Sequence, residues 1–489
     1  LLAYAVIELA IGAAGLLFDT AYQAGTGQAY ELMQATGAAH GIRWSVATLL
    51  VLPQCILLGA TFPLMSAGFM RLQPASEGRI LAGLYFSNSI GAAVGALVAT
   101  YVLLPRVGLP GTILTAGLVN ILVALAIYPL AKLATPPVPP ARPAVTSQLH
   151  APLLILLVAA LTGATSFVYE ITWIRMLSLA LGTTLHAFEL MLAAFIAGIA
   201  FGGLWLRSRA DRLVSPLATA GWVQVWMGLA ALASMFVYAN AFEWVGWLMR
   251  TLAHTTEGYV AYNVASGAIS LLVMFPAAFC AGMTLPLLTL ALLRQGGGER
   301  VIGYVYAVNT LGAIAGVLIA VHLLLPLVGL KLSMWLAAGV DLLLGIVVLS
   351  VVGDRRIAWQ RSAPVLASVL AISGLGISMW AVHFDPSMLA SSVYRHGTTS
   401  LGSARVLFHR DGKTASVSVY ENAAGRRSIA TNGKVDAGLK MDRRAPPSSD
   451  EYTMALLAAL PLSMRERYPR VGVIGFGSGM TSHYLLRSP

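Results

Sequence analysis

The sequence GMTLPL at residues 282–287 repeats the sequence GATFPL at residues 59–64, with an offset of 223 positions. Upstream, Gly12 fits Gly228 at an offset of 216. Two further pairs of segments match at an offset of 221: YFSNSIG at 85–91 with YAVNTLG at 306–312, and LPRVGL at 104–109 with LPLVGL at 325–330. Since several independent segments keep nearly one offset, the sequence predicts an internal repeat.

Long apolar runs surround these repeated segments. A helix needs about 20 mostly apolar residues to cross a bilayer, and eleven runs meet this condition. They cover 3–22, 43–69, 81–104, 111–131, 151–180, 184–206, 216–238, 262–292, 301–325, 331–352 and 362–383. The first four spans match the seventh to tenth, so we expect a unit of six spans whose first copy lacks two helices. Two such copies run parallel, like the halves of major-facilitator-type transporters.

The composition agrees with a membrane protein. Only 10% of the 489 residues are charged and 57% are hydrophobic, whereas soluble proteins carry about 25% charged residues. The charges are uneven, because residues 1–352 hold 25 of them and residues 353–489 hold 26. Most basic residues lie in short loops between apolar runs, so the net charge of +11 does not predict a nucleic-acid partner. The two cysteines are too few for a zinc site, and we predict no metal.

Alternate loops between the spans are rich in arginine, and this side is expected to be cytoplasmic. If residues 362–383 cross the membrane, the segment that follows lies on the non-cytoplasmic side. If they lie in the membrane interface, that segment is cytoplasmic. The arginine-rich loops carry Arg71 and Arg79; Lys132 and Arg142; Arg207, Arg209 and Arg212; Arg294 and Arg300; and Arg355, Arg356 and Arg361.

The fifth span carries a polar cluster. Tyr169 and Trp173 are four residues apart and share a helix face. Glu170 and Arg175 are five apart, about 140° around the helix, so they cannot pair directly. We expect their partners on the next helix, where Glu189 is one candidate and His186 another.

Charged groups within spans are costly and mark functional candidates. One interpretation of the cluster is a site for a cationic or zwitterionic ligand. The other is an ion pair between helices near the membrane interface, flanked by aromatic belt residues. Asp341 lies in the middle of a span, so the interface does not explain it as readily.

The pattern changes from helical to alternating after the last span. Residues 414–420 and 427–431 predict strands, and Asn432-Gly433 predicts a hairpin turn. Asp450 and Glu451 predict the start of a helix that runs to Leu462. The run 471–474 predicts a buried strand. It leads into a glycine loop with Gly475, Gly477, Ser478 and Gly479, whose glycines allow a ligand to approach the backbone.

This order of segments resembles the spermidine synthase (polyamine aminopropyltransferase) family in its membrane-fused bacterial form. The resemblance covers almost the whole chain. Its specific parts are the repeated spans, the sequence Asn432-Gly433-Lys434-Val435-Asp436, the sequence Asp450-Glu451-Tyr452 and the glycine loop.

The resemblance implies a partial Rossmann-like, methyltransferase-type α/β domain that binds decarboxylated S-adenosylmethionine and an amine such as putrescine. Gly475, Gly477, Ser478 and Gly479 would bind the adenosyl co-substrate; Asn432, Asp436, Asp450 and Tyr452 would bind the amine. Soluble members usually have a glutamine soon after the hairpin glycine, a Tyr-His-Glu type sequence on the helix and an aspartate in the loop. This chain has Asp436, Tyr452-Thr453-Met454 and Ser478 there, and we expect its catalytic acidic residues downstream of Pro489.

Three functions remain open. The first is a membrane-bound aminopropyltransferase, the second is an amine transporter or exporter with a regulatory or degenerate adenosyl-cofactor domain, and the third is a transferase for another adenosyl cofactor. The resemblance implies a bacterial plasma-membrane protein, and we expect this chain to continue at both ends. The expected domains are four spans at 1–131, a linker at 132–150, six spans at 151–352, a basic loop and extra span at 353–400, and the start of the synthase-like domain at 401–489.

Overall fold

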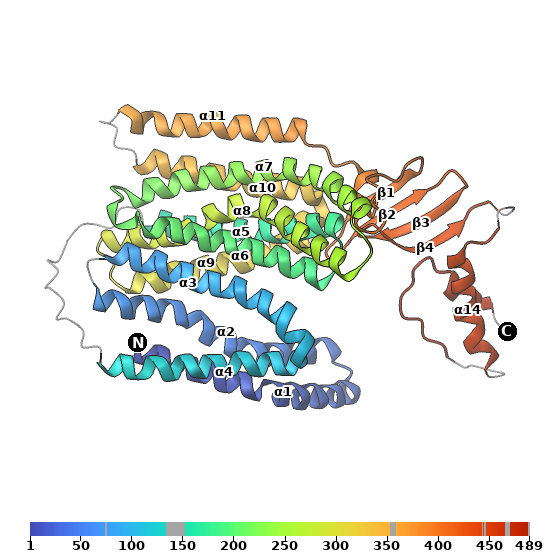
Figure 1. Cartoon of the computed structure of the whole chain (residues 1–489), viewed down its shortest axis with the longest axis horizontal. Helices are drawn as coiled ribbons and strands as arrows, with labels where there is room; N and C mark the ends of the chain where they lie inside the picture. The colour runs from blue at the N-terminus through green and yellow to red at the C-terminus, as the bar shows by residue number, and fades with distance from the viewer. Residues whose placement is uncertain are drawn as a thin grey trace.

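The computed structural model describes residues 1–73, 76–133, 152–352, 358–442, 444, 446–464 and 470–487. The proline-rich linker lies almost wholly outside these residues, as do Arg142, Arg355 and Arg356. Within them a bundle of long helices leads into a small sheet, with a helix beyond it (Figure 1). The long helices are α1 (Leu2–Thr36), α2 (Ala39–Leu72), α3 (Glu77–Val98), α4 (Leu104–Leu133), α5 (Pro152–Leu181), α6 (Leu185–Arg207), α7 (Pro216–Thr251), α8 (Thr256–Arg294), α9 (Arg300–Ile319), α10 (Leu325–Val352) and α11 (Ala358–Ala381).

The described helices have the length and apolarity of membrane spans. Among the described residues, nine helical segments are long and apolar enough to cross a membrane. In this count, α3 and α4 form one continuous segment, and α9 and α10 form another. Each of the eleven predicted spans corresponds to one of the long helices. Several helices extend beyond the predicted apolar core, because helical bonding continues into polar residues outside it.

The internal repeat is visible in local backbone irregularities. A π-helical segment, η2 (Ala99–Leu103), precedes α4, and a second one, η4 (Ala320–Leu324), precedes α10 at an offset of 221 residues. A break follows in each helix, at Gly108 (φ 66°) and at Gly329 (φ 75°), again 221 apart. Only glycine adopts this conformation readily, which explains why the glycine recurs in both copies.

One helix contact recurs in the same way. At Gly12, an added side chain would lie 2.8 Å from the carbonyl oxygen of Gly117. At Gly228, it would lie 2.9 Å from the carbonyl oxygen of Ala338. Thus α1 packs closely on α4 as α7 packs on α10, through glycines that the sequence comparison had matched.

Polar contacts join α2 and α3 to later segments of the chain at the arginine-rich end of the bundle. Arg71, at the end of α2, pairs with Glu299 before α9 at 2.7 Å. The Oδ1 atom of Asp211 accepts hydrogen bonds from the backbone N–H groups of Gly78 (2.9 Å) and Arg79 (3.2 Å), at the start of α3. A carboxylate is favourable there, because the first amides of a helix lack helical partners.

Helix α11 runs alongside the bundle, against α7 and α10 (Figure 1). Trp335 Nε1 donates to the carbonyl oxygen of Leu375 at 3.1 Å, and Lys331 Nζ donates to that of Met379 at 2.9 Å. The sheet therefore lies at the end of the bundle opposite to the arginine-rich loops. This position is the one expected if the 362–383 segment crosses the membrane.

The sheet is a four-stranded antiparallel meander in the order β1 (Arg405–Asp411), β2 (Ser416–Glu421), β3 (Arg426–Thr431) and β4 (Lys434–Lys440). β2 and β3 confirm the two predicted strands within a few residues. Asn432 (φ 49°) and Gly433 (φ 79°) form the predicted tight turn between β3 and β4. The segment between α11 and β1 holds two short helices, α12 (Pro386–Leu389) and α13 (Val393–His396).

The predicted strand at 471–474 is wrong. These residues form no strand, and Val471 and Ile474 are exposed. A strand needs a neighbour to satisfy its backbone groups, and all the strands among the described residues belong to the meander. The predicted helix is confirmed as α14 (Ser449–Ser463), and α15 (Met480–Arg487) follows the glycine loop.

Candidate functional site

The glycine loop lies against α14. Gly475, Gly477 and Gly479 all have positive φ, at 90°, 54° and 78°. Ser478 Oγ contacts Met454 Sδ of α14 at 3.0 Å, and Thr481 Oγ1 donates to the carbonyl oxygen of the same residue at 3.2 Å. A side chain added at Gly475 or Gly477 would meet open space, so a ligand can reach the backbone there. These features fit a loop that receives a ligand before a helix N-terminus.

A capping box fixes the start of α14. Ser448 Oγ accepts from the backbone N–H of Glu451 at 3.2 Å, and Glu451 Oε2 accepts from the backbone N–H of Ser448 at 2.7 Å. Ser448 Oγ also donates to the carbonyl oxygen of Gly438 in β4, at 3.1 Å. The box therefore ties Asp450 and Tyr452, in the first turn of α14, to the sheet, and Tyr452 stays exposed.

The four residues predicted to bind the amine are not brought together. Asn432 lies at the bundle end of the sheet, where its Oδ1 accepts from the backbone N–H of Ser416 at 2.9 Å. Asp436 accepts a hydrogen bond from Thr431 Oγ1 on the neighbouring strand. Asp450 lies beside Gly438, and four residues of β4 separate Gly438 from Lys434 at the turn, about 13 Å along the strand. Of these four residues, only Asp450 and Tyr452 are close in sequence to Met454, the α14 residue that Ser478 and Thr481 contact.

The membrane cluster is centred on Asp341. Its Oδ1 accepts from Thr165 Oγ1 at 2.7 Å, and its Oδ2 accepts from the hydroxyl of Tyr169 at 2.6 Å. Trp173, whose ring centroid is 5.3 Å from that of Tyr169, donates through Nε1 to Ser234 Oγ at 2.8 Å. All five side chains are buried, Asp341 and Trp173 fully so. Sequence reasoning placed Tyr169 and Trp173 here and noted the unusual position of Asp341, but did not connect them.

The other cluster residues have different surroundings. Arg175 donates to the carbonyl oxygen of Gly412 at 3.2 Å and to Ser416 Oγ at 3.4 Å, so its partners lie in the β1–β2 hairpin and not on the next helix. His186 contacts the hydroxyl of Tyr259 through Nδ1 at 2.7 Å. Glu170 and Glu189 are both partly buried on α5 and α6. The expected pairing of Arg175 with Glu189 or His186 is therefore wrong, because the hairpin reaches the end of α5.

The same hairpin holds α10 at its break. Asp411 Oδ2 accepts from the backbone N–H of Leu330 at 3.0 Å, and Arg410 donates to the carbonyl oxygen of Pro326 at 3.1 Å. Burial lowers the pKa of His409, and the nearby Asp411 carboxylate partly opposes this shift. The hairpin thus contacts the ends of α5 and α10, the two helices that share the Asp341 cluster.

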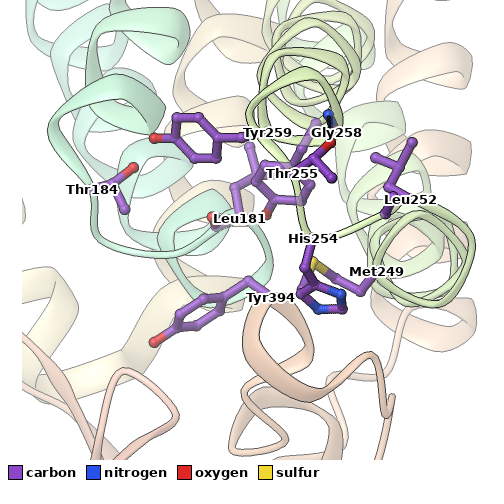
Figure 2. Close-up of a pocket in the computed structure, with 11 residues that line it drawn as sticks. Leu181, Thr184, Met249, Leu252, His254, Thr255, Gly258, Tyr259 and Tyr394 are labelled. Atoms are coloured by element: carbon purple, nitrogen blue, oxygen red, sulfur yellow. Dashed lines mark hydrogen bonds between the residues drawn. The ribbon is translucent and has the colours of Figure 1, made fainter.

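A cavity of about 350 Å³ lies near the sheet end of the bundle. Figure 2 shows Tyr259, His254 and Tyr394 around it, with Leu181 and Met249 among the apolar residues. The tyrosine hydroxyls have partners elsewhere, so mainly rings and apolar groups face the space. Such a cavity suits an alkyl chain or an ammonium group held by aromatic faces.

Among the residues that the structure describes, no group of three or more His, Cys, Asp or Glu side chains could hold a metal ion. No family model, no curated protein and no solved structure matches the chain.

Proposed function

We propose that the chain is a membrane-bound aminopropyltransferase-like protein, which transfers an aminopropyl group from decarboxylated S-adenosylmethionine to an amine such as putrescine. The observation that carries the proposal is the glycine loop. Three glycines with positive φ lead into α15, and the loop is seated on α14, beyond the turn that carries Asp450 and Tyr452. The same proposal includes a Rossmann-like, methyltransferase-type domain and a location in the bacterial plasma membrane, both of which the sequence resemblance implies.

The reaction is a displacement at carbon. The amine nitrogen forms a bond to the aminopropyl carbon attached to the sulfonium, and the carbon–sulfur bond breaks. Its electron pair goes to sulfur, which leaves as the neutral thioether methylthioadenosine. A carboxylate takes the proton that the amine loses. The protein chiefly has to hold the two reactants in line.

In this chain, the open backbone at Gly475 and Gly477 would lie along the adenosyl co-substrate. Asp450 lies four residues before the loop contact at Met454, and its carboxylate would attract the cationic amine, whereas the Glu451 carboxylate is held in the capping box. Tyr452 is exposed beside it and would supply a hydroxyl. Asn432 would act away from this point, because it lies before the start of β4, whereas Asp436 lies on β4 two residues before Gly438, the neighbour of Asp450.

Turnover with purified protein tests the proposal. The full-length protein in detergent, incubated with decarboxylated S-adenosylmethionine and putrescine, should yield spermidine and methylthioadenosine in equal amounts. Gly477→Val should abolish turnover, because valine blocks the open backbone and disfavours a φ of 54°. Gly472→Val is the matched control, since Gly472 also faces open space and precedes the loop. Absence of turnover with a range of amines would sink the proposal.

A specific observation favours a second function, amine transport. The buried Asp341 carboxylate is bound only by hydroxyl groups within the part of the chain that the structure describes. A buried acid without a cationic partner in a membrane helix suits a coupling or substrate site. Labelled putrescine flux into proteoliposomes should then fall in Asp341→Asn and persist in Asp442→Asn, an exposed control in the sheet segment. Equal flux in both variants would remove this function.

A further inference from the structure

A second cavity, of about 490 Å³, lies between the sheet and the segment that joins it to α11. Its walls come from residues 390–402 and from one side of the sheet. They include Ser391, Ser392, Arg395 and His396 on the side of the joining segment, and Tyr420 and Gly433 on the side of the sheet. The volume falls within the range of small-molecule sites, about 300–1,000 Å³.

The charge of this cavity is positive. Arg395 and His396 line it, and no acidic residue does. Both side chains are exposed, and neither makes a hydrogen bond or ion pair within the described part of the chain. By contrast, Arg250 nearby already donates to the carbonyl oxygen of Gly397. Two neighbouring basic side chains are therefore available to a ligand.

Two serines in the cavity wall have unused hydroxyl groups. Ser391 and Ser392 are each 4% exposed, and their Oγ atoms have no hydrogen-bond partner among the described residues. Native proteins leave few buried polar atoms unpaired, and such atoms often mark a missing ligand or water.

The backbone of Ser392 is also held in an unusual conformation. Its φ of 57° is rare for a residue other than glycine. Such strain is concentrated at functional sites. The turn between β3 and β4 contacts this residue, since a side chain at Gly433 would lie 3.1 Å from the backbone nitrogen of Ser392. The sheet therefore fixes the serine at the cavity.

We propose that this cavity binds the phosphate group of an organic phosphate. A guanidinium group forms charge-assisted hydrogen bonds with phosphate oxygens, and an imidazole N–H and serine hydroxyls add further donors. The cavity is larger than a phosphate group alone needs, which leaves room for the organic part. The site is separate from the proposed amine chemistry, because its basic residues repel a cationic polyamine.

Two sources share this chemistry. The cavity lies beside the sheet end of the bundle, where a phospholipid headgroup could reach it, and it also faces solvent, where a soluble phosphomonoester could enter. Calorimetry on the full chain in phosphate-free detergent buffer separates them. The titrants are glycerol 1-phosphate, a short-chain phosphatidylglycerol, and the matching diacylglycerol as a control without phosphate.

Binding of glycerol 1-phosphate supports the site with a soluble ligand, and binding of phosphatidylglycerol alone supports it with a lipid ligand. Arg395→Gln should weaken the affinity for the phosphate compound that binds at least about tenfold. Arg426 is an exposed arginine outside the cavity, and Arg426→Gln should leave this affinity unchanged. Ser392→Gly relieves the backbone strain and removes the hydroxyl, so it should fold and still bind less tightly. Binding of neither phosphate compound, or equal binding by the wild type and Arg395→Gln, would overturn the proposal.

Discussion

The contact between Asp411 and Leu330 can be tested on its own. The Asp411 side chain is 10% exposed, and it accepts the backbone N–H of Leu330 at 3.0 Å, immediately after the break at Gly329. Asp411→Ala removes this acceptor, together with the Oδ1 atom that accepts from Ser416 Oγ at 2.5 Å inside the hairpin. A hydrogen bond to a charged group contributes roughly 1.5–3 kcal/mol. Since 1.4 kcal/mol is a factor of ten, the protection of this amide should fall about 10- to 150-fold.

Hydrogen exchange measured by mass spectrometry checks this estimate. The peptide that contains Leu330 should exchange faster in Asp411→Ala, and peptides from the middle of α10 should not change. Asp442→Ala is the control, because this exposed carboxylate accepts only from the backbone N–H of Arg444 among the described residues. If Leu330 exchanges equally in the wild type and in Asp411→Ala, the hairpin does not hold the α10 break, and the reasoning fails.

Three further outcomes are expected. Asp341→Leu should lower the free energy of unfolding in detergent by about 1–3 kcal/mol, because it leaves the hydroxyl of Tyr169 buried without an acceptor. Asp341→Asn should lower it less, and thermal unfolding measures both variants. Ser448→Ala removes the capping box and should cost about 1 kcal/mol, seen as loss of protection in α14 by hydrogen exchange. The pKa of His409 is lowered in the folded state, so the unfolded state binds more protons below about pH 6.5 and stability should fall as the pH drops through that value. His409→Gln should flatten this dependence in denaturation curves measured between pH 5 and 8, and an unchanged curve would rule out His409 as its source.

The long apolar helices could be predicted almost completely from the sequence. Hydrophobic length alone identifies a span, because a bilayer requires about 20 apolar residues whatever the neighbours are. The matched segments contain Gly108 and Gly329, and the structure then showed that both have a positive φ at a helix break. The turn at Asn432-Gly433 was predictable from its local sequence.

The candidate sites needed the tertiary structure. Thr165 and Asp341 are 176 positions apart, and helix periodicity says nothing about which helix faces which. Arg175 has partners in a hairpin 237 residues away, which no local pattern indicates. The basic cavity with Ser392 depends on a loop folding back onto the sheet.

The sequence by itself determined the helices, their repeat and the turns, because these follow from local propensity and from the thickness of a bilayer. The tertiary structure decided three things: the sheet lies opposite to the arginine-rich loops, Asp341 joins α5 to α10, and residues 471–474 form no strand. The reason is common to all three. Hydrogen bonds between distant segments, and the partners that a strand or a buried carboxylate requires, exist only once the chain has folded.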